Sequence, residues 1–200
     1  MKDPIVQAGA PVLKAVAAPV PKKDITSRKI KAVIAKMKKA LAKEDFGVAI
    51  AAPQIGVPLR IFVVSGKAFV PPRQDDENGL VEAKPTRGPF RRPDEAVPGD
   101  RVFINPEITR LSKKKREMSE GCLSVRGKYG TVLRHEKASI RAQDERGTPI
   151  TYHGTGLIGH IFQHECDHLD GILYTDKAIR LEEDEDMRGA RQKLKDKHGV

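Results

Sequence analysis

The feature that most constrains this chain is a pair of histidines, His164 and His168, four residues apart within an apolar segment. Residues 156–169 carry aliphatic and aromatic side chains at helical spacing, and Asp170-Gly171 follows as a stop signal, so we predict a largely buried helix. Side chains four residues apart project from one helix face, which brings both imidazoles within reach of one divalent cation. Because buried histidines need polar partners, the sequence predicts a metal site on a core helix.

The residue after the first histidine supports a hydrolytic role for such a site. Glu165 lies about 100° round the helix from His164, where a carboxylate reaches a metal-bound water more naturally than the metal itself. The His-Glu-x-x-His arrangement is typical of hydrolytic zinc sites. The alternative, two solvated histidines on a polar helix, fits poorly with the flanking residues Ile161 and Phe162.

A catalytic metal site takes a third protein ligand, for which three residues are considered. Cys166 lies on roughly the opposite helix face from His164 and is expected to be a packed thiol. His160 is on the correct face, but three ligands at this spacing would span about 12 Å of helix, too far for one ion. We therefore expect His160 to be a pocket wall or a core histidine. Cys122 is the best third ligand and completes a Cys-His-His set.

Composition narrows the class of protein. The chain has 200 residues, 32% of them charged, which suits one globular catalytic domain. Two cysteines make no disulfide framework, no apolar run is long enough to span a membrane, and no targeting signal is evident. We therefore expect a cytoplasmic protein. The net charge of +10 raises the question of a polyanionic partner but determines neither fold nor chemistry.

The pattern along the chain predicts an α+β domain. A helix is expected over residues 24–43, capped by Asp24, Thr26 or Ser27, and strands over 59–64 and 101–108, with a hairpin over 131–152. Two segments fall outside this pattern: a proline-rich loop insertion at 71–99 and a charged C-terminal tail at 177–200.

Three segments together resemble one family. Gly-Val-Ala-Ile-Ala-Ala-Pro-Gln at residues 47–54, Glu-Gly-Cys-Leu-Ser at 120–124 and Gln-His-Glu-Cys-Asp-His at 163–168 resemble the three motifs of peptide deformylases, in the same order. The similarity extends from about residue 12 to about residue 176, without the 71–99 loop. Ala49 replaces the second glycine of the first motif, and Tyr129 stands near the place of an arginine that often follows the second motif.

The resemblance implies a fold, an activity and a set of residue roles. The fold would be α+β, with antiparallel sheets packed around a central metal-binding helix. The activity would be removal of the N-formyl group from the formyl-methionine of new polypeptides, releasing formate. The implied catalytic residues are Glu165 as general base and then acid, with the Gln54 amide and the backbone N–H of Leu123 as oxyanion donors; the implied metal ligands are Cys122, His164 and His168.

The resemblance also implies substrate contacts and a metal. Val48 and Ala49 would bind the substrate backbone as an added strand, and Leu157, His160 and Ile161 would line the methionine pocket. An apolar residue is expected where His160 stands. One divalent ion is implied, Fe(II) in the cell, with Zn(II) or Ni(II) as other occupants. Glu120 and Asp167 are either orienting residues around the metal or structural residues, and the sequence leaves both alternatives open.

Two other functions remain to be weighed. A metallopeptidase that cuts internal peptide bonds would share the His-Glu-x-x-His pattern, but it would leave Cys122 and Gln54 unexplained. A basic nucleic-acid-binding protein would use residues 113–116 and the lysines of the first helix, yet only 4% of residues are aromatic and no specific DNA motif is present. The basic surface is also compatible with a transient ribosome contact by a deformylase.

Overall fold

The computed structural model describes residues 3–69 and 99–183, which contain two α-helices and eight strands. The helices are α1 (Arg28–Leu41) and α2 (Gly156–Leu169). The strands are β1 (Ala49–Ala51), β2 (Ile61–Val64), β3 (Arg101–Leu111), β4 (Lys115–Cys122), β5 (Val125–His135), β6 (Lys137–Gln143), β7 (Pro149–Thr155) and β8 (Ala178–Glu183). Neither helix is long and apolar enough to cross a membrane.

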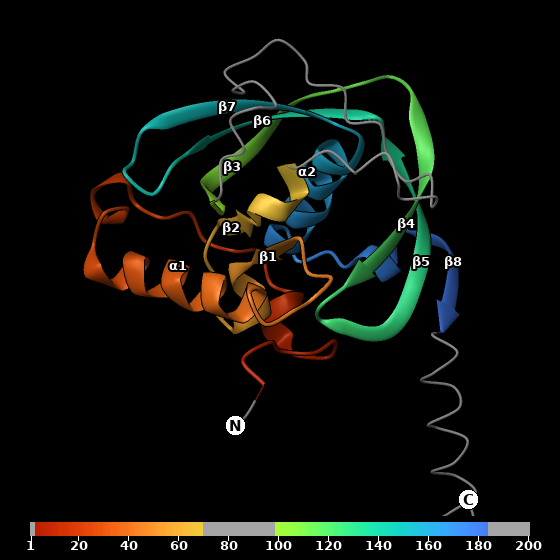
Figure 1. Cartoon of the computed structure of the whole chain (residues 1–200), viewed down its shortest axis with the longest axis horizontal. Coiled ribbons are helices and arrows are strands. Elements are labelled where there is room, and N and C mark those ends of the chain that lie inside the picture. Colours follow the sequence, from red (N-terminus) through yellow and green to blue (C-terminus); the bar gives the residue numbers. More distant parts are fainter. Residues whose placement is uncertain (1–2, 70–98, 184–200) are drawn as a thin grey trace, which may run out of the picture.

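The strands form two antiparallel sheets around α2. One sheet has the order β1-β2-β3-β6-β7 and the other the order β4-β5-β8. Figure 1 shows α2 in the middle, with the larger sheet curving over it, β4, β5 and β8 at its side, and α1 along the outer flank. The predicted α+β class with antiparallel sheets around a central helix is therefore confirmed.

Helix α2 is central because most of its side chains are buried, and the apolar ones pack against the larger sheet. Phe162 packs edge-on against Phe103 of β3, with ring centroids 5.5 Å apart, and Phe103 stacks on Phe62 of β2 at 4.7 Å. Leu169 and Cys166 are buried in the same cluster. A helix covered on so many sides holds its polar side chains in fixed positions, which suits a metal site.

Helix α1 is amphipathic, as its sequence predicts. Ile30, Ile34 and Met37 are buried beneath it, and its opposite face is basic. Ser27 caps the helix by accepting a hydrogen bond from the backbone N–H of Ile30 at 3.3 Å, so one of the three predicted caps is used.

The predicted strand at 101–108 continues to Leu111, with an irregularity where the sequence has Asn105-Pro106. Asn105 has a φ of 50°, in the left-handed region that asparagine tolerates better than most residues. Its side chain accepts a hydrogen bond from the N–H of Val20 at 2.7 Å and donates to the carbonyl of Val20 at 2.8 Å. The bulge therefore fastens the N-terminal segment to the sheet.

Two sequence predictions need correction or fall outside the structure. Residues 178–183, predicted to belong to a charged tail, form strand β8, in which Ile179 and Leu181 alternate with charged residues and the backbone pairs with β5. Apart from Gly99, the 71–99 insertion lies outside the described residues, as does the tail from residue 184 onward.

Candidate metal centre and its cleft

A cavity of about 680 Å³ lies between the two sheets and against α2. Ala49 of β1 lines one wall, and residues 119–122 of β4 line another. Among the described strands, β1 and β4 each have a neighbour on one side only. Because an edge strand leaves a row of backbone N–H and C=O groups unpaired, such walls are suited to binding an extended chain.

The three ligands proposed from the sequence meet beside this cavity. Cys122 ends β4, while His164 and His168 project from α2, and their ligand atoms all lie within 4.8 Å of one another. Sγ of Cys122 is 3.2 Å from Nε2 of His168. Sulfur and imidazole nitrogen are the donors that zinc, iron and nickel accept in proteins, so these residues fit a bound metal ion.

Glu120 is a buried carboxylate that orients one of these histidines. Its Oε2 lies 2.7 Å from Nδ1 of His164, and its Oε1 lies 2.8 Å from Nε2 of His160. Arg134 donates to both carboxylate oxygens, at 2.6 and 3.1 Å. Burial opposes the charge of Glu120, but the contacts with His160, His164 and Arg134 hold its pKa well below the usual range. Because Glu120 engages Nδ1 of His164, Nε2 of that ring remains for a metal ion.

Arg134 connects this carboxylate to the rest of the fold. Its side chain is buried on β5 and also pairs with Asp167 of α2, which in turn accepts from Lys177 at 2.6 Å. Sequence reasoning did not single out Arg134. The signal was the alternation along β5, which places Arg134 on the same inward face as Val132.

Glu165 is buried in the cavity wall, and its Oε2 has no hydrogen-bond partner among the residues that the structure describes. Burial raises the pKa of Glu165 to about 7; positive charge on His164 opposes this shift and Glu120 adds to it. A carboxyl group with a pKa near neutrality can both accept and return a proton at physiological pH.

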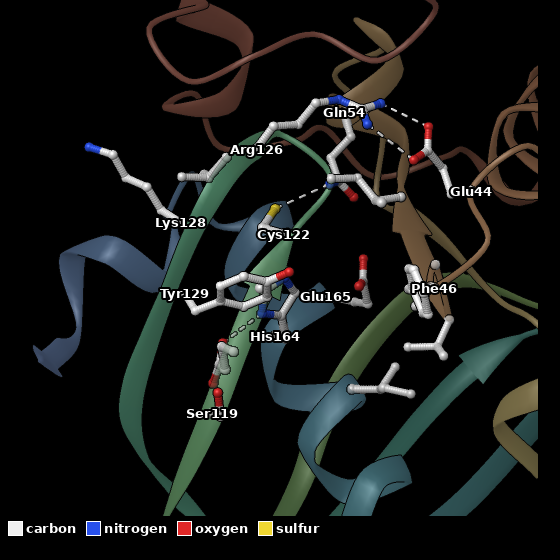
Figure 2. Close-up of a pocket in the computed structure, with 18 of the residues that line it drawn as sticks. Glu44, Phe46, Gln54, Ser119, Cys122, Arg126, Lys128, Tyr129, His164 and Glu165 are labelled. Atoms are coloured by element: carbon white, nitrogen blue, oxygen red, sulfur yellow. Dashed lines mark hydrogen bonds and ion pairs between the residues drawn. The ribbon is translucent and has the colours of Figure 1, made fainter. Parts of the chain in front are cut away.

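Gln54 is held with its amide nitrogen toward Cys122. Its Oε1 accepts from the N–H of Ala51 at 2.8 Å, while Nε2 lies 3.4 Å from Sγ of Cys122 and 3.3 Å from Oγ of Ser124. Leu123 follows Cys122 and also lines the cavity. The structure thus brings the proposed oxyanion donors to the same place as the proposed metal ligands, as Figure 2 shows for Gln54 and Cys122.

The proposed substrate contacts line the cavity as well. Leu157, His160 and Ile161 lie on α2 about one to two turns before His164, and they form part of the same cavity as Val48 and Ala49. His160 is therefore a pocket wall, held against Glu120, while Cys166 is a packed thiol whose pKa burial raises to about 12.

An ion pair that sequence reasoning missed joins two walls of the cleft. Arg126, just after the start of β5, donates to both carboxylate oxygens of Glu44, at 2.8 and 3.2 Å, and Glu44 follows α1. Figure 2 shows this pair beside Gln54. No local pattern marks it, because its members are 82 residues apart.

One thiolate and two imidazoles, with an unpartnered carboxylate and a fixed amide around one open cavity, define the site of a metal-dependent hydrolase. Residues 2–184 match the family described as polypeptide deformylase. The chain belongs to that family.

Relatives in sequence and in structure agree with this assignment. The chain is 38% identical over 176 residues to peptide deformylase 1A, chloroplastic, of Solanum lycopersicum, an alignment covering 86% of this chain and 58% of that protein. It is 36% identical over 177 residues to the peptide deformylase of Carboxydothermus hydrogenoformans, covering 88% and 93%. The chain thus spans less than two thirds of the plant relative and nearly all of the bacterial one.

Solved structures show the same fold. A class I type b peptide deformylase from Acinetobacter baumannii, crystallised with Met-Ala-Ser, superposes with a TM-score of 0.67 at 29% identity, covering 86% of this chain and 96% of that one. A peptide deformylase from Synechococcus elongatus in complex with actinonin gives 0.67 at 27% identity, covering 90% and 81%.

Proposed function

We propose that this protein is a peptide deformylase that removes the N-formyl group from the formyl-methionine of new polypeptides and releases formate. The observation that carries the proposal is the meeting of Cys122, His164 and His168 at a cavity whose wall also holds the unpartnered carboxylate of Glu165. The reaction adds water across the formyl C–N bond, giving formate and the free amine of methionine.

The metal would be held by Cys122, His164 and His168. Such an ion lowers the pKa of a bound water to about 7 and polarises a carbonyl oxygen. Glu120 fixes the ring of His164 through Nδ1, and Arg134 fixes Glu120. The donor set accepts Fe(II), Zn(II) and Ni(II) alike, and family membership implies Fe(II) as the occupant in the cell.

Glu165 is the proton carrier in this proposal. It takes a proton from the attacking water and gives it to the amine nitrogen as the C–N bond breaks. Burial without a hydrogen-bond partner for Oε2 supports this role, because it keeps the carboxyl pKa near 7 and leaves the oxygen open to water.

Gln54 and Leu123 stabilise the negative charge that develops on the formyl oxygen. The Gln54 amide is fixed by Ala51 on one side, so its Nε2 donates without reorganising, and the backbone N–H of Leu123 is the second donor. Loss of one such donor typically lowers the rate by about 10²- to 10³-fold.

The peptide lies in the cleft as an added strand. Ala49, at the free edge of β1, and Val48, directly before β1, would bind the peptide backbone, and the Met-Ala-Ser complex of the Acinetobacter enzyme supports binding of a short peptide in this fold. The methionine side chain must lie close to the reacting formyl carbonyl, because the α carbon that carries it is bonded to the nitrogen of the cleaved C–N bond. Leu157, His160 and Ile161, on the turns of α2 before the ligands, are placed to receive it.

The substrate class also suggests where the protein works. Formylated chains emerge from ribosomes, so we place the protein with the translation machinery in the cytoplasm. The basic face of α1 would make a transient contact with ribosomal RNA, because counterion release favours binding of basic surfaces to polyanions. No contact with membranes or with specific DNA sequences is proposed.

The test is an assay of the metal-loaded protein on formyl-Met-Ala-Ser and on the same peptide without the formyl group. We expect formate and free Met-Ala-Ser from the first peptide and no cleavage of the second. Cleavage between Met and Ala in either peptide, without formate, would show a metallopeptidase instead.

A further inference from the structure

Two aromatic side chains lie at the rim of the cleft and belong to none of the buried clusters of residues 3–69 and 99–183. Phe46, in the turn after α1, is 98% exposed, and Tyr129 of β5 is 49% exposed, yet both line the cavity that holds Glu165 and His164. Figure 2 shows Phe46 and Tyr129 on either side of Glu165. Since each exposes a large apolar surface to water, covering that surface would be favourable.

Tyr129 is held in place by its neighbour on β4. It pairs with Gly121, and a β carbon on Gly121 would lie 3.1 Å from Cε1 of the ring, so the ring rests directly on the glycine. The tyrosine is thereby positioned next to Cys122 rather than free to rotate into solvent. Phe46 has no comparable support, so it can adapt to what binds.

Charged side chains also line the cavity, and two of them, Arg126 and Glu44, are paired with each other. Arg126 is bonded to Glu44 and also lies 3.2 Å from Asp3, which ties up the ionic groups nearest Gln54. Arg126 and Glu44 therefore offer little to a polar substrate residue. Phe46 and Tyr129 are the aromatic residues among those lining the cavity.

We propose that Phe46 and Tyr129 form a subsite that binds an apolar, preferably aromatic, side chain of the residue that follows methionine or of the next residue along. This proposal rests on the proposed function, because it takes the occupant to be the emerging peptide. Successive side chains of an extended peptide point to opposite faces. We therefore expect either the second or the third residue of the peptide, but not both, to place its side chain against Phe46 and Tyr129.

The first experiment compares formyl-Met-Ser-Ser with formyl-Met-Trp-Ser and formyl-Met-Ala-Trp as substrates. We expect kcat/KM to be about three- to tenfold higher for one tryptophan peptide, through a lower KM, in line with the strength of aromatic pairs. The ratio should fall close to one in the double variant Phe46→Ser/Tyr129→Ser. Tyr129→Phe should keep the ratio, because the ring and not the hydroxyl makes the contact.

Leu133→Ser is the matched control, because Leu133 is also a half-exposed apolar residue of β5 but does not line the cavity. It should keep the wild-type ratio. Equal kcat/KM for all three peptides, or a preference that survives in the double variant, would overturn the proposal.

Binding can be followed without turnover, because the chain contains no tryptophan. The emission of Met-Trp-Ser or Met-Ala-Trp then reports on the peptide alone, and we expect a blue shift with the wild-type protein that is lost in the double variant. A blue shift without formate release from any formyl peptide would uphold the subsite and refute deformylation. Formate release without a blue shift of either peptide would uphold deformylation and refute the subsite.

Discussion

At the scale of single residues, two nearby glutamates of the site have opposite pKa shifts because their surroundings differ. Glu120 touches Arg134, His160 and His164, so its charge is compensated and its pKa lies well below the usual range. For Glu165, burial raises the pKa to about 7, and the opposing effect of positive charge on His164 is too small to prevent it. Two carboxyl groups with pKa values pushed apart are suited to different roles, one holding a ligand and the other moving a proton.

Glu165→Gln tests the proton-carrying role. The amide preserves size and leaves the three ligands in place, so we expect metal content to stay at the wild-type level while kcat falls by about 10²- to 10⁴-fold. Elemental analysis and formate release measure the two quantities. A variant that retains wild-type kcat would contradict the role.

His160→Leu tests the methionine pocket. His160 places an imidazole ring at a position of the pocket where the family resemblance leads us to expect an apolar side chain. A contact between a thioether sulfur and the edge of an aromatic ring is favourable by about 0.3–1.5 kcal/mol. Wild type should therefore prefer formyl-Met over formyl-norleucine peptides by roughly two- to tenfold, and the variant should lose this preference. A preference that is the same in both proteins would remove His160 from the pocket.

At the scale of elements, the helices and strands that have a clear apolar periodicity could be predicted from the sequence. Both helices and the hairpin of β6 and β7 follow from apolar spacing and turn residues, although residues 131–135, predicted to belong to that hairpin, are part of β5 in the other sheet. Cys122, His164, His168 and Glu165 followed from metal-ligand chemistry. The Arg126–Glu44 pair could not be predicted in this way, because it joins segments far apart in the chain and carries no local apolar signal. Strand β8 was missed although Ile179 and Leu181 alternate with charged residues, because the segment is short and lies within a charged stretch.

The turn between β6 and β7 gives a pH-dependent prediction. Burial opposes the charge of Asp144, but hydrogen bonds from the backbone N–H groups of Thr148 and Arg146 outweigh it and lower the pKa below 3.8. The ionised form is thus favoured by folding, and its contribution is present above about pH 4 and lost as pH falls through the lowered pKa.

Asp144→Ala should therefore lower the free energy of unfolding by about 1 kcal/mol at pH 7. The difference from wild type should shrink in acid, and urea unfolding at several pH values measures it. Glu145→Ala is the control, because Glu145 forms an exposed ion pair with Lys38, and its loss should lower the free energy of unfolding by less than about 0.5 kcal/mol. A difference that grows as the pH falls would have the wrong sign for this account.

At the scale of the whole molecule, the net charge of +10 is unevenly placed. Helix α1 carries no acidic residue, although acids near its N-terminus would favour the helix dipole. Its exposed basic residues are Arg28, Lys29, Lys31, Lys36 and Lys39. This distribution makes α1 the surface with which the proposed ribosome contact is tested.

The double variant Lys29→Glu/Lys36→Glu should co-sediment with ribosomes less than wild type at low salt, while wild-type association should weaken as salt rises. Lys113→Glu/Lys114→Glu, with the same charge change away from α1, is the control. Equal co-sedimentation of all three proteins would place any contact elsewhere.

The central claim is that Cys122, His164 and His168 hold the metal that supports deformylation. The most direct measurement is the metal content of Cys122→Ser together with formate release from formyl-Met-Ala-Ser. The account predicts that this variant binds metal at least tenfold more weakly than wild type and releases little formate. Full metal content with wild-type formate release in Cys122→Ser would contradict it.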